Sequence, residues 1–278
     1  MKTFDKTFAL ALGGGGARGI AHIALIEALD EMNVRPVAIA GTSIGALIGA
    51  AYAAGMPGKA IRRHVLAMAH DRTDVFRRLI AARAGTIASL FALGTGRATL
   101  VDGEKLCAQF MPEVVPEDFS ALAIPLTVMA SDLHRRRQVA FSAGALRPAL
   151  AASIALPSLI RPMVIDGQVL VDGGATNPLP FDQLRGKADI VVAIDISGEP
   201  REERLDIPSP WECLVSTVLV MGNAITTEKL KHGAPDIMVR PNVGIFRTLD
   251  FFHASSILRA AEPAKAEFVD ALAALLAR

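Results

Sequence analysis

Two strand–turn–helix units follow one another at the start of this sequence. The apolar run Thr7–Leu12 leads through four consecutive glycines into a helical pattern over Ala17–Met32. A second apolar run, Val37–Ala40, leads through a glycine-flanked serine into a helix that begins at Ile44. Short strands that alternate with helices form parallel sheets covered on both faces. We therefore predict an α/β fold, a three-layer αβα sandwich with a mainly parallel central sheet.

The remainder of the chain continues this alternation without an internal repeat or a Pro/Ser-rich linker. Later strands are predicted at Pro125–Ala130, Gln138–Ser142, Gln168–Val171 and Asp189–Ile194, and an amphipathic helix at Arg259–Arg278. The segment Ala84–Gly103 contains four glycines and no clear period, which is typical of a mobile loop or lid. We expect one domain over residues 1–278, with residues 61–106 as a lid or variable region.

Composition excludes several classes of protein. The formal net charge is +1, so overall charge gives no reason to expect nucleic-acid binding. The two cysteines, Cys107 and Cys213, are too few for a disulfide framework and lack the spacing of a metal site. Residues 37–58 carry no charge, yet five glycines and a proline there favour a buried strand–turn–helix over a membrane span. The first apolar run is too short for a signal peptide. We expect a cytoplasmic protein.

One serine lies in a G-x-S-x-G motif, Gly41-Thr42-Ser43-Ile44-Gly45, between a predicted strand and a predicted helix, as this motif requires. A serine on so sharp a turn adopts strained backbone angles, so the residues two positions away must lack side chains that would collide. Gly41 and Gly45 meet this requirement. The turn presents the hydroxyl at the carboxyl ends of the strands, with a helix N-terminus directed at it. Ser43 is therefore the candidate nucleophile; the alternative is a tight turn that serves packing alone.

The glycine-rich loop before the first helix has more than one interpretation. Gly14, Gly16 and Gly19 satisfy the G-x-G-x-x-G pattern of dinucleotide sites, but the second predicted strand ends without the acidic residue that holds a ribose. Unblocked N–H groups at a helix start would instead stabilise the oxyanion formed in acyl transfer. Arg18 either adds positive charge or fixes the loop through a salt bridge. A glycine turn for close helix packing is the structural alternative.

A serine hydroxyl needs a neighbouring base. Three aspartates follow predicted strands: Asp132, Asp172 and Asp195. Of these, Asp172 is followed by Gly173 and Gly174, which let the carboxylate approach another loop closely. Exclusion of water near Ser43 would raise the proton affinity of the Asp172 carboxylate enough for it to act as a base. His253 is the alternative base, because it keeps the chain order Ser, Asp, His.

Three motifs occur in the order GGGGARG, GTSIG and DGG, at Gly13–Gly19, Gly41–Gly45 and Asp172–Gly174. This arrangement resembles the signatures of patatin-like phospholipases, which use a Ser–Asp dyad without histidine. The resemblance implies that Ser43 is the nucleophile and Asp172 the base. It also implies an oxyanion hole at the N–H groups around Gly14, Gly15 and Gly16, with Arg18 beside it.

The resemblance extends over about Phe8–Ala261. Ala152–Pro157 is similar to the family's A-S-x-x-x-P, and Asn177–Pro180 and Pro235–Ala261 resemble compact bacterial members related to neuropathy target esterase. Pro178 stands where many relatives have asparagine, so the resemblance does not specify the hydrogen bonding around Asp172.

The implied activity is hydrolysis of fatty acyl esters of phospholipids or lysophospholipids through an acyl-enzyme, with no cofactor and no metal. The same residues would serve a soluble carboxylesterase or thioesterase, or the fold would persist as a regulatory interaction module; the intact motifs favour an enzyme.

Lipid substrates imply transient contact with a membrane surface. Residues 62–83, with six arginines and two aspartates, form either an interfacial helix pair or an amphipathic cap with a solvated basic face. Head group and oligomeric state are not specified.

Overall fold

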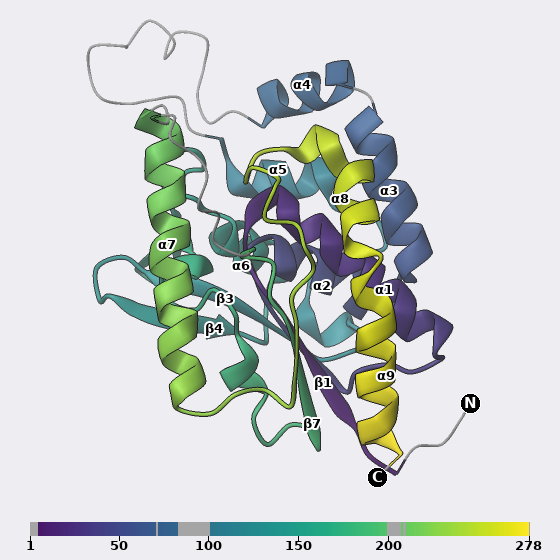
Figure 1. Ribbon diagram of the computed structural model, residues 1–278. Coiled ribbons are helices and arrows are strands. Elements are labelled where there is room, and N and C mark those ends of the chain that lie inside the picture. Colours follow the sequence, from purple (N-terminus) through teal and green to yellow (C-terminus); the bar gives the residue numbers. More distant parts are fainter. Residues whose placement is uncertain (1–4, 71, 83–100, 199–206, 208–209, 278) are drawn as a thin grey trace, which may run out of the picture.

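The protein is built on one mixed sheet with helices packed against it (Figure 1). The computed structural model describes residues 5–70, 72–82, 101–198, 207 and 210–277. The strands within these residues are β1 Phe8–Leu12, β2 Ala38–Thr42, β3 Leu126–Asp132, β4 Arg137–Phe141, β5 Met163–Ile165, β6 Gln168–Asp172, β7 Ile190–Ile194 and β8 Ile237–Val239. They pair in the order β5–β6–β3–β2–β1–β7–β8, and β4 also pairs with β3. The predicted α/β fold is confirmed.

Parallel pairs outnumber antiparallel pairs in the sheet, and short connections account for two of the three antiparallel pairs. The pairs β1–β2, β1–β7, β2–β3 and β7–β8 are parallel, whereas β3–β4, β3–β6 and β5–β6 are antiparallel. Asp166 and Gly167 join β5 to β6, and their φ angles of 49° and 70° are those of a type I′ hairpin turn. Residues 133–136 join β3 to β4. Connections this short reverse the chain, because a parallel connection needs a crossover of about a dozen residues or more.

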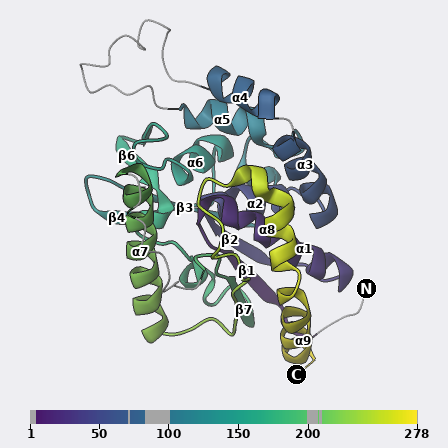
Figure 2. The same ribbon diagram turned by 45° about the horizontal axis from the view of Figure 1, so that its top comes forward.

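Helices cover the sheet on both faces, with α1, α2, α8 and α9 on one side and α7 on the other (Figures 1 and 2). The α-helices are α1 His22–Glu31, α2 Ile44–Ala53, α3 Gly58–His70, α4 Arg72–Ala81, α5 Gly103–Phe110, α6 Leu146–Ser153, α7 Pro210–Lys231, α8 Ala254–Ala261 and α9 Ala264–Leu276. Side chains of β1 alternate between the two faces. Phe8, Leu10 and Leu12 enter the larger core, and Ala9 and Ala11 enter the smaller one.

Both terminal helices differ from the prediction because each is divided in two. A 3-10 helix, η1 Gly16–Ala21, precedes α1. The predicted helix over Arg259–Arg278 belongs to α8 and α9, which are separate because Pro263 has no N–H to continue the helical ladder. Helix α7 was not predicted. Its sequence is rich in valine, isoleucine and threonine, which have low intrinsic helix propensity.

The charge-free stretch over residues 37–58 contains β2, α2 and the start of α3, as the strand–turn–helix interpretation predicts. Among the described residues, no helix is both long enough and apolar enough to span a bilayer. Most of the expected lid, residues 84–100, lies outside the described part of the chain.

Candidate active site

Two distant segments meet end to end on one edge of β3. Strand β2 pairs with β3 up to Thr42 opposite Met129, and β6 pairs with β3 from Asp172 opposite Ala130. Strand β4 pairs with the same residues of β3 and occupies its opposite edge. Because a strand has only two hydrogen-bonding edges, β2 and β6 share one of them. Ser43 follows Thr42 directly and so comes to lie against Asp172, 129 positions away in sequence.

Ser43 holds a strained backbone conformation between β2 and α2. Its φ and ψ angles are 54° and −124°, a region that residues other than glycine rarely adopt. Two hydrogen bonds hold the turn. The N–H of Ser43 donates to Oγ of Ser153 at 2.9 Å, and Oγ1 of Thr42 donates to the carbonyl of Asn177 at 2.7 Å. The turn therefore has the strained geometry that the motif predicts.

Gly41 and Gly45 have no space for a side chain. A Cβ on Gly41 would lie 2.6 Å from Cα of Ala46, and a Cβ on Gly45 would lie 2.3 Å from the carbonyl oxygen of Leu12. Both neighbours are backbone atoms, which cannot move without disturbing α2 or β1. Gly41 thus allows the first turn of α2 to lie close to β2, and Gly45 allows it to pack directly on the end of β1.

The substitution Gly45→Ala is expected to destabilise the protein by about 2–3 kcal/mol, because the added methyl group overlaps the Leu12 carbonyl. Gly49→Ala, one turn further along α2, is the matched control. Its Cβ would meet side-chain methyl groups of Ile39 and Leu12 at 3.2 and 3.3 Å, and alanine gains about 1 kcal/mol of helix propensity over glycine. Chemical denaturation measures both. Equal stability of the two variants would contradict this packing argument.

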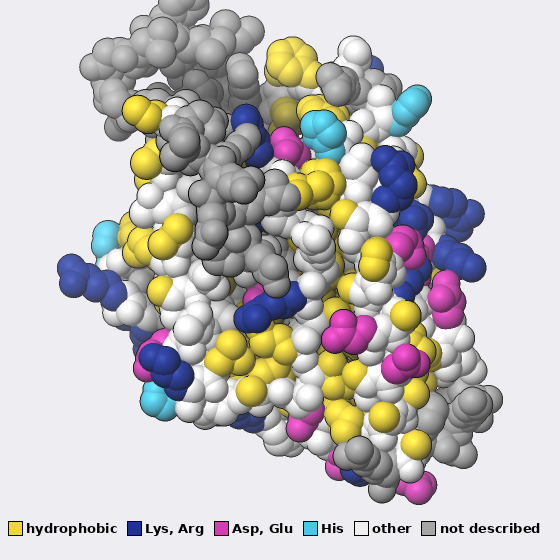
Figure 3. All heavy atoms as spheres, viewed as in Figure 1, with side chains coloured by type: hydrophobic (Ala, Val, Ile, Leu, Met, Phe, Trp, Pro, Cys, Tyr) yellow, Lys and Arg dark blue, Asp and Glu magenta, His cyan; other side chains and the backbone are white. Residues whose placement is uncertain are grey.

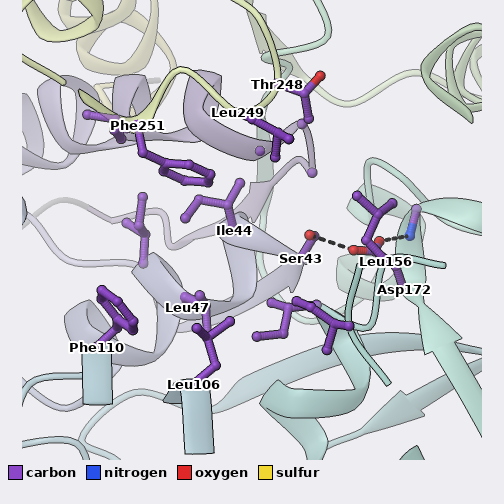
Figure 4. A pocket seen from close by; sticks show the side chains of 18 of the residues that line it. Ser43, Ile44, Leu47, Leu106, Phe110, Leu156, Asp172, Thr248, Leu249 and Phe251 are labelled. Carbon is purple, nitrogen blue, oxygen red and sulfur yellow. Dashed lines mark hydrogen bonds between the residues drawn. The ribbon is translucent and has the colours of Figure 1, made fainter. Parts of the chain in front are cut away.

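Ser43 and Asp172 share a hydrogen bond in a buried setting (Figure 4). Oγ of Ser43 donates to Oδ2 of Asp172 at 2.7 Å, and the N–H of Gly174 donates to Oδ1 at 2.7 Å. Burial raises the pKa of Asp172 to about 6, although these two hydrogen bonds oppose the rise. Gly173 allows the turn to approach β3, since a Cβ there would lie 2.4 Å from the carbonyl oxygen of Met129. Asp172 is thus ionised at neutral pH and a stronger base than an exposed aspartate.

The glycine loop lies beside Ser43, but one of its three expected donors is occupied. The N–H of Gly14 donates to the carbonyl of Pro178 at 2.9 Å, so the expectation that it serves the oxyanion hole is wrong. Within the described part of the chain, the N–H groups of Gly15 and Gly16 have no hydrogen-bond acceptor. Both residues line the cavity next to Ser43. Gly15 and Gly16 therefore remain the candidate oxyanion donors.

Side chains on η1 and α1 hold the loop in place. His22 is fully buried, and its Nε2–H donates to the carbonyl of Gly13 at 2.8 Å; burial lowers the pKa of His22 to about 4, so the ring is neutral. Arg18 donates from Nε to the carbonyl of Phe246 at 2.8 Å and from Nη1 to the carbonyl of Ser197. Of the two roles predicted for Arg18, these contacts with carbonyl groups support fixing the loop.

Two more glycines of this loop are positions of close packing. A Cβ on Gly16 would lie 2.2 Å from the carbonyl oxygen of Thr248, and a Cβ on Gly19 would lie 2.2 Å from Cγ2 of Ile44. The carbonyl of Thr248 also accepts the N–H of Ala17 at 2.7 Å. The segment around Thr248 therefore closes over the loop, which argues against the dinucleotide interpretation.

The other candidate bases have different partners. His253 is 59% exposed and lies 4.0 Å from Asp250, and it does not line the cavity that contains Ser43. Asp132 accepts from the side chain of Arg135. Asp195 lines the cavity, but its carboxylate accepts from Arg240 at 3.0 Å. No cluster of metal-ligating side chains occurs within the described ranges.

A cavity of about 530 Å³ opens at Ser43. Most of the side chains that line it are apolar, and they come from α2, α3, α5, α7 and residues 248–252. Figure 4 shows Ser43 between two groups of these residues. On one side lie Ile44, Leu47, Leu106, Phe110 and Phe251, and on the other lie Asp172 and Leu156. The site can hold an extended apolar group next to the nucleophile.

Sequence reasoning missed the contacts that join the serine turn and the glycine loop to the loop after Asp172. The carbonyls of Asn177 and Pro178 accept from Thr42 and from the N–H of Gly14, so one loop contacts both the serine turn and the glycine loop. Lys229, near the end of α7, donates to Oδ1 of Asn177 and to the carbonyl of Leu179. Ser153 lies in the Ala152–Pro157 motif noted in the sequence. Its place beside Ser43 could have been inferred only because the Ser43 N–H, at a helix start, needs a hydrogen-bond acceptor.

Comparison with known proteins identifies the family. Residues 10–185 match the model of the family described as patatin-like phospholipase. The chain belongs to the patatin-like phospholipase family. The Ser43 turn, the glycine loop and the DGG turn all lie within the matched residues.

Relatives and solved structures of patatin-like proteins agree with this assignment. An uncharacterised NTE family protein of Mycobacterium tuberculosis is 36% identical over 208 residues, which are 73% of this chain and 54% of that protein. The lysophospholipase NTE1 of Yarrowia lipolytica is 26% identical over 270 residues, 88% of this chain and 18% of that protein. The chain thus spans about half the length of the mycobacterial relative. The crystal structure of VipD from Legionella pneumophila shares the fold, with a TM-score of 0.52 and 15% identity over 95% of this chain and 66% of that one.

Proposed function

We propose that this chain hydrolyses fatty acyl esters of phospholipids or lysophospholipids, with Ser43 as nucleophile and Asp172 as base. The observation that carries the proposal is the 2.7 Å hydrogen bond from Ser43 to Asp172 at the wall of an apolar cavity. Membership of a phospholipase family and similarity to a protein named as a lysophospholipase support the substrate class.

The mechanism follows from the positions of the two side chains. Oδ2 of Asp172 takes the proton of Ser43 as Oγ attacks the ester carbonyl carbon. The oxyanion that forms accepts hydrogen bonds from the N–H groups of Gly15 and Gly16. When the tetrahedral intermediate collapses, Asp172 returns the proton to the departing alkoxide and an acyl-enzyme remains. Asp172 then takes a proton from water as the water oxygen attacks the acyl-enzyme. It returns this proton to Oγ of Ser43 when the second tetrahedral intermediate releases the fatty acid.

Exposed apolar side chains at the cavity mouth support transient membrane contact. Phe76, Leu79 and Ile80 are exposed on α4, and Figure 3 shows hydrophobic side chains gathered there at the top of the view. Phe251 and Phe252 are each 42% exposed and line the cavity. Side chains of this kind around an active-site opening would insert into a lipid surface.

The arginines near the mouth support this contact less strongly than their number predicts. Arg62 forms ion pairs with Glu27 and Glu262, at 2.6 and 2.7 Å, and so faces the protein rather than a lipid surface. The interfacial interpretation of residues 62–83 therefore rests on the apolar side chains of α4.

A fluorophosphonate probe tests the nucleophile, and a lipid panel tests the substrate. The probe is expected to label folded protein at Ser43, as located by peptide mass spectrometry, because the serine is activated by Asp172. The panel compares phosphatidylcholine vesicles, lysophosphatidylcholine and p-nitrophenyl butyrate, and we expect the lipids to be hydrolysed, with vesicles preferred over monomeric lipid. Absence of labelling would contradict the proposal. Labelling with hydrolysis of p-nitrophenyl butyrate alone would favour a carboxylesterase.

A further inference from the structure

The residues that line the cavity lie in two directions from Ser43. One arm follows α2 toward α3 and α5, and we call it the α2 arm; its walls include Leu47, Ile48, Ala51, Ile61 and Val65. The other arm, the α7 arm, is lined by residues of α7, among them Asn223 and Thr226, and by residues of the loop after Asp172. Figures 1 and 2 both show α3 and α7 on opposite sides of α2.

Proton transfer decides which part of an ester enters which arm. The acid that protonates the leaving alkoxide must touch its oxygen. Asp172 lies on the α7 side of Ser43, since the turn that follows it packs against α7. Figure 4 places Asp172 and the side chains of Leu47, Leu106 and Phe110 on opposite sides of Ser43. The alcohol therefore departs toward α7, and the acyl chain extends the other way.

The α2 arm has a closed end. Ile44, Leu47, Ile48 and Ala51 face it at helical spacings of three and four residues, so it follows one face of α2. Exposure falls along this face, from the half-buried Leu47 to Ile48 at 4% and Ala51 at 3%, and Ile61 opposite is 2% exposed. From Ser43 to Ala51 the helix advances by about 12 Å. The closed end is thus long enough for a medium acyl chain and shorter than an extended palmitoyl chain.

We propose that the α2 arm binds the acyl chain, that the α7 arm receives the alcohol, and that Ala51 limits the length of acyl chain that the closed end accepts. This assignment rests on the proposed function. Ala51 is the determinant because its side chain is the smallest among those that face the arm from α2, so a larger residue there shortens the arm without touching Ser43, Asp172 or the glycine loop.

The test compares p-nitrophenyl butyrate with p-nitrophenyl octanoate, which share an alcohol and differ in acyl chain. Ala51→Leu is expected to lower kcat/KM for octanoate relative to butyrate by about 50-fold, since leucine displaces roughly three methylene groups, each worth about fourfold. Activity on butyrate should remain. Val65→Phe narrows the same arm from α3 and should also lower the octanoate-to-butyrate ratio of kcat/KM. With this second variant, the test still works if Ala51→Leu fails to fold.

Two control variants lie on α7. Ala224→Leu makes the same substitution at an exposed position that does not line the cavity, and it should leave the octanoate-to-butyrate ratio unchanged. Asn223→Leu alters the α7 arm and should change discrimination between p-nitrophenyl and naphthyl butyrate without changing that ratio. A change of the ratio in Asn223→Leu with none in Ala51→Leu and Val65→Phe would overturn the assignment.

Failure of the proposed function gives a different result. If Ser43 is not a nucleophile, wild-type protein hydrolyses neither ester and Ser43 is not labelled by the fluorophosphonate probe. The assignment of the arms then falls together with the proposed function. Wild-type activity with unchanged chain-length preference in both arm variants contradicts the assignment of the arms alone.

Discussion

Replacement of Ser43 by alanine is expected to reduce kcat for ester hydrolysis by at least about 10⁴-fold while the protein remains folded. The substitution removes the attacking oxygen and the hydrogen bond to Asp172. The backbone bond from residue 43 to Oγ of Ser153 does not involve the side chain of Ser43 and is retained. Hydrolysis of p-nitrophenyl butyrate and thermal unfolding followed by circular dichroism measure the two properties.

Ser158→Ala is the matched control for this variant. Ser158 also has a positive φ angle, 69°, is exposed and does not line the cavity, so this substitution removes a hydroxyl without changing the wall around Ser43. We expect it to keep wild-type activity. Activity of Ser43→Ala above about one-hundredth of the wild-type value would show that another group is the nucleophile.

Asp172→Asn is expected to abolish hydrolysis and to stabilise the fold at neutral pH. The amide cannot accept the proton of Ser43, but its oxygen still accepts the N–H of Gly174. Burial raises the pKa of Asp172 to about 6, so the folded protein binds this proton more tightly than the unfolded chain does. Stability from this group is therefore present below the unfolded pKa and is lost as pH rises through about 6. The neutral amide avoids that loss, which is worth about 3 kcal/mol.

Urea denaturation at mildly acidic and mildly alkaline pH measures this effect, and Asp132→Asn provides a control of opposite sign. Hydrogen bonds from the backbone and side chain of Arg135 hold the pKa of Asp132 below its ordinary value, so its contribution is lost as pH falls. We expect Asp132→Asn to destabilise at alkaline pH, where Asp172→Asn stabilises. The wild-type rate of hydrolysis should rise with pH through about 6. A rate independent of pH between 5 and 8 would contradict Asp172 as the base.

The serine turn and the strand-end aspartate could be predicted because both follow from local sequence. A glycine on each side of Ser43, with a strand before and a helix after, specifies the strained turn within five residues. Asp172 is marked by the strand before it and the glycines after it. The hairpin at Asp166 and Gly167 carries an equally local signal, yet strand β5 was not predicted, since its three residues are too short to show a period.

The contacts that were missed depend on residues far apart in the sequence. The bond from the Gly14 N–H to the Pro178 carbonyl removes an expected oxyanion donor, and no pattern near Gly14 indicates it. Lys229 reaches Asn177 across 52 positions from a helix that was itself not predicted. Such contacts depend on how elements pack after the sheet has formed, which local propensity does not specify.

The meeting of β2 and β6 on one edge of β3 makes the spacing of Ser43 and Asp172 a matter of strand register. The helices α3, α4 and α5, which lie between β2 and β3 in the sequence, take no part in that pairing. They can therefore change in length and sequence during evolution while Ser43 and Asp172 stay opposite each other. An engineer can thus exchange the helices α3, α4 and α5 for another cap without changing the strand register that holds Ser43 against Asp172.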